Sequence, residues 1–224
     1  MMRLHHARTG IALHELTHGD GLPLLVLHAL GGASADWRGP AAAWPGRVYG
    51  VDFSGHGESD PLGGAAYWPE LLLGDADVAL EQIGPAAVAG AGLGAYIALL
   101  LAGSRPQSVP AALLLPGRGL AGGGPQPDFD RPFLTALTPS DHPPLPAGCD
   151  PLCCALDLDP RPPEYAAQFA AAARRLLLVE DGAPRPPWWE AARPHAEVLN
   201  GDAVAALEIL TKNRHHGGTE ARRR

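Results

Sequence analysis

The stretch from Val88 to Ile97, Val-Ala-Gly-Ala-Gly-Leu-Gly-Ala-Tyr-Ile, constrains the fold of this chain more than any other. It is typical of a short buried strand, a sharp turn and the start of an apolar helix. Its glycines, Gly90, Gly92 and Gly94, have the spacing of a nucleophile elbow, in which the middle residue is held at a strained positive φ between closely packed neighbours. A catalytic elbow carries Ser, Cys or Asp in the middle, whereas Gly92 has no side chain. A plain strand-to-helix turn is the other interpretation.

Apolar runs alternate with helical patterns along the chain, which predicts an α/β fold with a mostly parallel central sheet and helices on both faces. The expected strands are 11–16, 22–27, 47–51, 86–89, 111–115, 176–179 and 196–199, and the expected helices are 68–83, 93–102, 164–175, 187–192 and 202–210. A polar turn is expected at 17–21. Right-handed crossovers place the carboxyl ends of parallel strands along one edge, where such sheets bind ligands.

The length of 224 residues fits one domain, and 46% hydrophobic with 18% charged residues indicates a globular chain. We predict a single domain over 1–210 and a mobile tail over 211–224. The Pro-rich stretch 117–163 is expected to form an irregular excursion with one short helix near 131–137.

Charge and hydropathy narrow the expected partners. A net charge of −7 argues against nucleic acid, and no run approaches the roughly 20 apolar residues of a membrane span. The first residues lack an apolar signal core, so a cytoplasmic location is expected. Three cysteines, Cys149, Cys153 and Cys154, make neither a disulfide framework nor a complete zinc site by spacing, and their role is left open. A nucleophilic cysteine would have only His142 near it in sequence.

Two further motifs accompany the elbow. His28-Ala29-Leu30-Gly31-Gly32 follows the strand at 22–27, and Asp52-Phe53-Ser54-Gly55-His56-Gly57-Glu58-Ser59 follows the strand at 47–51. The first is similar to a His-Gly-x-Gly oxyanion loop, and the second to an Asp-x-x-Gly-x-Gly-x-Ser loop. The chain order of the three motifs is the His28 motif, the Asp52 motif and the elbow. Motifs and order together resemble the α/β-hydrolase superfamily, in its esterase- and lipase-like branch. The resemblance implies the α/β-hydrolase fold, with the stretch 117–163 as a reduced cap, and carboxylic ester hydrolysis.

That chemistry requires a nucleophile, an acid and a histidine base, in that chain order. The nucleophile position falls on Gly92, which cannot attack a carbonyl carbon. The acid is implied in the loop after 176–179, where Asp181 or Glu180 stands.

The base is implied directly after the strand at 196–199, where Asn200-Gly201-Asp202 contains no histidine. His195 precedes that strand and is therefore expected at the opposite end of the sheet. His215 and His216 lie beyond the last expected helix. The resemblance thus implies a triad with its acid position kept and its nucleophile and base missing.

The first functional hypothesis is a protein with a degenerate triad that binds a small acyl or carbonyl compound. The backbone N–H groups of Leu93 and of Ala29 or Leu30 would form an oxyanion-type site at a helix N-terminus. No cofactor is required.

Two other hypotheses remain open. In one, the chain is a hydrolase or lyase of non-standard mechanism, with His28 or His56 as acid or base. In the other, it is an interaction module, with a homodimer through 202–210 or around Trp188-Trp189. More often, two such tryptophans pack a short helix onto the body of the domain.

His28 and His56, with Asp36 and Asp52 near them in sequence, have the residue types of a metal site. The same residues could instead make hydrogen bonds that brace their loops. The hydrogen bonds are the better explanation, with Asp52 bracing its own glycine loop, and no metal is expected.

Overall fold

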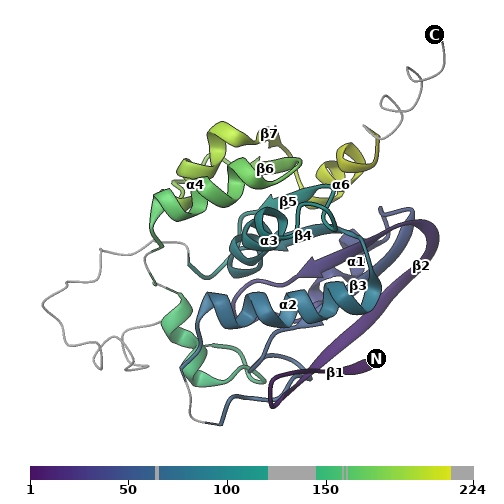
Figure 1. Ribbon diagram of the computed structural model, residues 1–224, viewed down its shortest axis with the longest axis vertical. Helices are drawn as coiled ribbons and strands as arrows, with labels where there is room; N and C mark the ends of the chain where they lie inside the picture. The colour runs from purple at the N-terminus through teal and green to yellow at the C-terminus, as the bar shows by residue number, and fades with distance from the viewer. Residues whose placement is uncertain (64–65, 121–144, 158, 160, 213–224) are drawn as a thin grey trace, which may run out of the picture.

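The computed structural model describes residues 1–63, 66–120, 145–157, 159 and 161–212 (Figure 1). Its centre is a sheet of seven strands, and β1, β2, β4, β5, β6 and β7 follow one another across it, with β3 paired to β2. The strands are β1 Met2–His6, β2 Thr9–Leu27, β3 Gly46–Asp52, β4 Ala87–Ala91, β5 Ala112–Leu115, β6 Leu176–Glu180 and β7 Glu197–Asn200. The predicted α/β class is confirmed.

Strand β2 enters the sheet twice, and Figure 1 shows it as a long, bent ribbon. Val48 of β3 pairs with Thr17 in the first half of β2 and with Leu24 in the second half. The expected turn at 17–21 is therefore wrong, because the backbone keeps pairing with β3 through the bend. The crossing needs a glycine, since a Cβ on Gly19 would lie 2.3 Å from the carbonyl oxygen of Pro45.

From the second half of β2 to β7 the sheet is parallel. Val26 pairs with Ala89 of β4, and Leu114 of β5 pairs with Leu178 of β6. The carboxyl ends of these strands therefore share one edge. Strand β1 was not predicted, because its side chains alternate between exposed and only partly buried positions and leave a weak apolar signal.

Helices cover both faces of the sheet. Leu25 and Val88 point into one core, which is closed by α2 Pro69–Ile83, α3 Leu93–Ser104, α4 Pro163–Ala172 and α5 Pro187–Ala192. Leu24 and Ala89 point into the other, which is closed by η1 Ser34–Trp37, α1 Arg38–Ala41 and α6 Ala203–Lys212. This alternation follows from the period of two in a strand. Helix α3 is buried from Leu93 to Ala102, as expected for a helix at the centre of the core.

Outside these elements, η3 Pro151–Leu156 and η4 Arg193–His195 are short 3₁₀ helices, and η3 is a regular element within the stretch expected to be irregular. Helix α6 reaches Lys212, so 211–212 do not belong to a tail. The short helix expected near 131–137 and the rest of the tail, 213–224, lie outside the described residues. Within the described part of the chain, none of the helices combines the length and the apolar character needed to span a membrane.

Candidate functional site

The elbow lies between β4, which ends at Ala91, and α3, which begins at Leu93. Gly92 has φ 53° and ψ −115°, a conformation that strains any residue with a side chain. The approach of strand and helix is close, since a Cβ on Gly90 would lie 2.0 Å from the carbonyl oxygen of Gly94. The structure thus has the backbone of a nucleophile elbow without a nucleophilic side chain.

The space above Gly92 is filled by the backbone of residues 117–120, here called the Arg118 segment. The carbonyl oxygen of Arg118 accepts the N–H of Leu93 at 2.9 Å and the N–H of Leu30 at 3.0 Å. A Cβ on Gly92 would lie 2.2 Å from the same oxygen. The N–H groups of Leu93 and Leu30, two of the donors expected from the sequence, therefore point to the same place, which the carbonyl oxygen of Arg118 occupies. Ala29 uses its carbonyl here, accepting the N–H of Gly32 at 2.9 Å.

The Arg118 segment is anchored from outside the elbow. Leu120 is buried in a left-handed conformation with φ 49°. Its N–H donates to the carbonyl of Leu156 at 2.7 Å, and its carbonyl accepts the indole N–H of Trp188 at 2.7 Å. The Arg118 guanidinium pairs with Asp157 at 2.9 Å. These contacts fix the position of the Arg118 carbonyl through the Arg118 side chain and through the backbone of Leu120.

Trp188 and Trp189 belong to the core. Each is 2% exposed, and their rings contact each other edge to face at 5.4 Å. The interpretation of this pair as an exposed interaction surface is wrong, because the indole of Trp188 packs on Tyr96 and anchors the Arg118 segment. A homodimer through α6 stays a prediction.

His28 is bound to backbone through both ring nitrogens. Nδ1 lies 2.8 Å from the carbonyl oxygen of Ala29 and must donate, while Nε2 accepts the N–H of Phe53 at 3.1 Å. Burial, followed by the neighbouring His56, lowers the pKa of His28 to about 3. The ring is therefore held neutral with its proton on Nδ1 and has no free lone pair to take a substrate proton. This arrangement favours a loop-bracing role over the acid or base role.

We expect the His28 ring to stay in the Nδ1–H tautomer from pH 8 down to about pH 5, where an ordinary histidine with a pKa near 6.5 is mostly protonated. Imidazole ¹⁵N shifts of the labelled protein measure this. A protonated His28 at pH 5 in folded protein would contradict the assignment.

Asp52 braces the loop that follows β3. Its buried carboxylate accepts the N–H of Ser34 at 2.7 Å and the N–H of Glu58 at 2.9 Å, and His14 Nε2 lies 3.3 Å away. Burial raises the pKa of Asp52, but the two backbone donors outweigh it, so the net shift is downward. Asp36 likewise accepts the N–H of Ala33 at 3.0 Å. Asp36, Asp52 and His28, which were candidate metal ligands, thus make hydrogen bonds to backbone groups instead.

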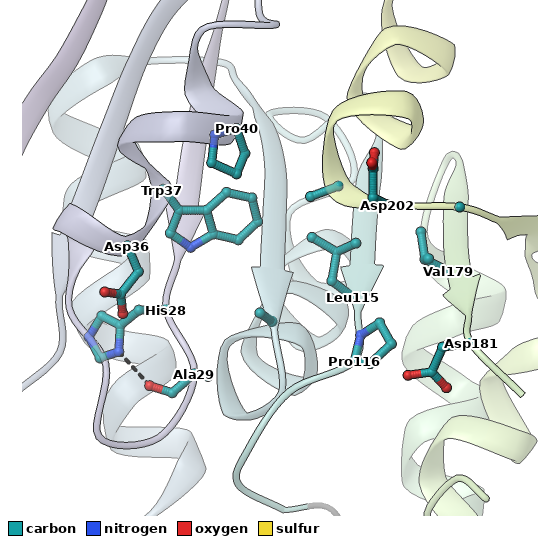
Figure 2. A pocket seen from close by; sticks show the side chains of 13 residues that line it. His28, Ala29, Asp36, Trp37, Pro40, Leu115, Pro116, Val179, Asp181 and Asp202 are labelled. Atoms are coloured by element: carbon teal, nitrogen blue, oxygen red, sulfur yellow. Dashed lines mark hydrogen bonds between the residues drawn. The ribbon is translucent and has the colours of Figure 1, made fainter. Parts of the chain in front are cut away.

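A groove lies beside the elbow at the carboxyl edge of the sheet, with a volume of about 370 Å³. Its floor is mostly apolar, and Figure 2 shows Asp36 on one side and Asp181 and Asp202 on the other. The lining residues are His28, Ala29, Asp36, Trp37, Pro40, Ala91, Leu115, Pro116, Val179, Asp181, Gly201, Asp202 and Ala203.

The groove includes the positions that the triad acid and base would take. Asp181 accepts the N–H of Ala183 at 2.9 Å and pairs with Arg185, and both contacts lower its pKa. No histidine is among its partners in the described chain. Gly201 and Asp202 line the place of the base, and His195 lies in η4, before β7, as expected.

One cluster was missed by sequence reasoning. His56 of the glycine loop meets Cys149 and Cys153, and their ligand atoms all lie within 4.8 Å of one another. The cysteine spacing was visible, but a histidine far away in sequence could be joined to it only by the fold. A hydrogen bond from Cys153 lowers the pKa of the Cys149 thiol, against the effect of burial.

Comparisons with known proteins agree with this geometry. No family model matches the sequence. A dihydrolipoyllysine-residue acetyltransferase component of an acetoin cleaving system from Pseudomonas putida is 33% identical over 117 residues, which cover 47% of this chain and 30% of that protein. The chain thus matches less than a third of the length of this relative.

Solved structures match over nearly the whole chain. The thioesterase domain from the curacin biosynthetic pathway has a TM-score of 0.67 at 16% identity, covering 93% of this chain and 96% of that one. A carboxylesterase of the thaumarchaeon Nitrososphaera gargenis has a TM-score of 0.65 at 18% identity, covering 95% and 94%. Bottromycin epimerase has a TM-score of 0.59 at 18% identity, covering 90% and 91%. The fold is the α/β-hydrolase fold, and the chain resembles esterases and thioesterases that have it.

Proposed function

We propose that this protein is a non-hydrolysing α/β-hydrolase-fold protein that binds a small acyl or carbonyl compound in the groove beside its elbow. In this proposal its triad is degenerate, with Gly92 at the nucleophile position and Asn200-Gly201-Asp202, which contains no histidine, at the position of the base. The observation that carries this proposal is that the carbonyl oxygen of Arg118 accepts hydrogen bonds from the N–H groups of Leu30 and Leu93.

The occupied donors argue against acyl transfer on physical grounds. An oxyanion site accelerates the reaction only if its donors are aimed at the oxygen on which charge develops. Here the same donors already satisfy an internal oxygen, and that oxygen also fills the volume in which a side chain at position 92 would start. A substrate carbonyl would have to displace Arg118 from both N–H groups before any bond could form. Hydrolysis of the usual kind is therefore not expected.

The groove favours an uncharged ligand over an anion. Three carboxylates, Asp36, Asp181 and Asp202, line it around an apolar floor that includes Trp37 and Leu115. An anionic ligand would meet like charges there, whereas an amide or ester would place its apolar part on the floor. Free lone pairs on the carboxylates would accept a ligand N–H or O–H. We therefore propose neutral acyl compounds, with primary amides as the best probes.

The purified protein should hydrolyse short-chain p-nitrophenyl esters no faster than a heat-inactivated sample, because it has neither an aimed nucleophile nor a base. The assay is ester turnover at pH 7 to 8 over a range of ester concentrations. Saturable turnover that is lost in His56→Ala, in a variant shown to be folded, would instead establish an enzyme of non-standard mechanism.

Ligand binding is tested with butyramide and butyrate by ligand-observed NMR. Butyramide is expected to bind saturably and butyrate at least about tenfold more weakly, because of the three carboxylates. Ala203→Phe fills the groove and should abolish binding, whereas Ala171→Phe on the exposed side of α4 should not. Equal binding by Ala203→Phe would place the ligand elsewhere.

A further inference from the structure

His56, Cys149 and Cys153 form a cluster outside the groove, and the ring of His56 lies 4.9 Å from that of His28, which lines the groove. His56 comes from the loop after β3, Cys149 from the turn before η3, and Cys153 from η3 itself. None of these side chains lines the groove. The proposed ligand binding therefore does not use them.

The spacing of the three donors is close to that of a metal site. The Cys153 Sγ and His56 Nδ1 atoms are 4.0 Å apart, and all three ligand atoms lie within 4.8 Å of one another. Around Zn²⁺, with bonds of about 2.0–2.3 Å, neighbouring ligands of a tetrahedron are about 3.5–3.8 Å apart. Closing the cluster on an ion requires shifts of about 1 Å or less, which thiol rotation supplies.

His56 has few hydrogen bonds for a fully buried imidazole. Its exposed fraction is 0%, and its Nε2 atom finds no hydrogen-bond partner in the part of the chain that the structure describes. Its Nδ1 atom makes two long contacts, 3.2 Å to the carbonyl oxygen of Ser54 and 4.0 Å to Cys153 Sγ. Buried polar groups are normally satisfied, so a ring this poorly bonded, facing two thiols, indicates a missing partner.

We propose that His56, Cys149 and Cys153 bind one Zn²⁺ ion, with water as the fourth ligand. Imidazole and thiolate are ligand types that suit zinc, and two cysteines with one histidine form a known three-ligand set. Binding forms two Zn–S bonds and one Zn–N bond and releases the thiol protons to solvent. No oxidation or reduction takes place.

An ion bound to this cluster would stabilise the segment from Cys153 to Asp157, which holds Arg118 in place. The same stretch of chain continues from Cys153 to Leu156, whose carbonyl accepts the N–H of Leu120, and to Asp157, which pairs with Arg118. A hydrogen bond also joins this stretch to the loop that follows β3: the N–H of Asp150 donates to the carbonyl of Gly55 at 2.7 Å. Zinc would therefore stabilise the position of the Arg118 carbonyl over Gly92.

The test is titration of untagged, reduced, metal-free protein with Co²⁺ as a spectroscopic probe, and then with Zn²⁺. We expect one equivalent of Co²⁺ to produce a thiolate-to-cobalt charge-transfer band and the visible bands of tetrahedral cobalt, and Zn²⁺ to remove both. At a free Zn²⁺ concentration 100 times the Kd, Tm should rise by about 5–10 °C. Surface histidines such as His5 and His6 cannot give the thiolate band.

Cys149→Ser and Cys153→Ala should each lose the band and most of the Tm shift. Cys154→Ala is the matched control, because Cys154 is also buried but lies outside the cluster, and it should retain both. Should Cys153→Ala fail to fold, the half-buried Cys149 still provides the test. Absence of a thiolate band, or a band that survives in Cys149→Ser, would overturn the proposal. So would a Cys149–Cys153 disulfide formed in air by a protein that takes up no metal when reduced.

Discussion

A Gly92→Ser variant is expected to lose about 3 kcal/mol or more of unfolding free energy and to gain no esterase activity. The serine would have to adopt the strained backbone conformation of the elbow, at about 1–3 kcal/mol. It would also push the Arg118 carbonyl off two buried N–H groups, and each unsatisfied group costs about 1–3 kcal/mol. Restoring the nucleophile restores neither the base nor the space for a substrate.

Denaturant unfolding of the two proteins, together with p-nitrophenyl ester turnover, measures both parts of this prediction. Gly84→Ser is the matched control: Gly84 also has a positive φ, of 79°, but a Cβ there meets no atom within 4 Å. That control should lose about 1–3 kcal/mol, the cost of the backbone conformation alone. A Gly92→Ser protein as stable as Gly84→Ser would show that the Arg118 segment yields easily. Robust ester hydrolysis would show that a base has been overlooked.

An Asp52→Ala variant should lose about 3–5 kcal/mol at pH 7, because hydrogen bonds to a charged group contribute about 1.5–3 kcal/mol each and two buried N–H groups lose their acceptor. Asp60→Ala, in the same loop, removes an exposed carboxylate that also accepts a backbone N–H, and it should cost much less. Urea unfolding of the three proteins compares them. A loss no larger than that of Asp60→Ala would rule out the bracing role.

The effect of Asp52 should depend on pH in a defined direction. Its pKa in the folded protein is below the ordinary value of 3.8, so the unfolded chain binds more protons near and below that pH. The stability that Asp52 contributes is therefore fully present above about pH 5 and is lost as the pH falls through the folded pKa. The difference between wild type and Asp52→Ala should shrink between pH 5 and pH 3. A difference that grows over this range would contradict the assigned shift.

Much of the fold could be predicted from local patterns. The continuous apolar run at 22–27 and the glycines at 90, 92 and 94 each reflect a constraint within a few residues, namely burial of both strand faces and the close approach of strand and helix. Strand β1 and the bend in β2 could not be predicted in this way. Their backbone is satisfied by pairing with β2 and β3, respectively, and not by a strong local preference.

For the candidate site, the sequence by itself determined the residues at three positions: Gly92 in the elbow, Asn200-Gly201-Asp202 at the end of β7 and directly after it, and Asp181 after β6. It also predicted that the N–H groups of Leu93 and of Ala29 or Leu30 meet at the elbow. Only the tertiary structure decided that the Arg118 carbonyl occupies those donors, that His28 uses both ring nitrogens on backbone, and that His56 meets Cys149 and Cys153. The physical reason is range: turn and strand preferences act between near neighbours, whereas these contacts join residues separated by up to 97 positions and form only when the sheet and its loops have packed.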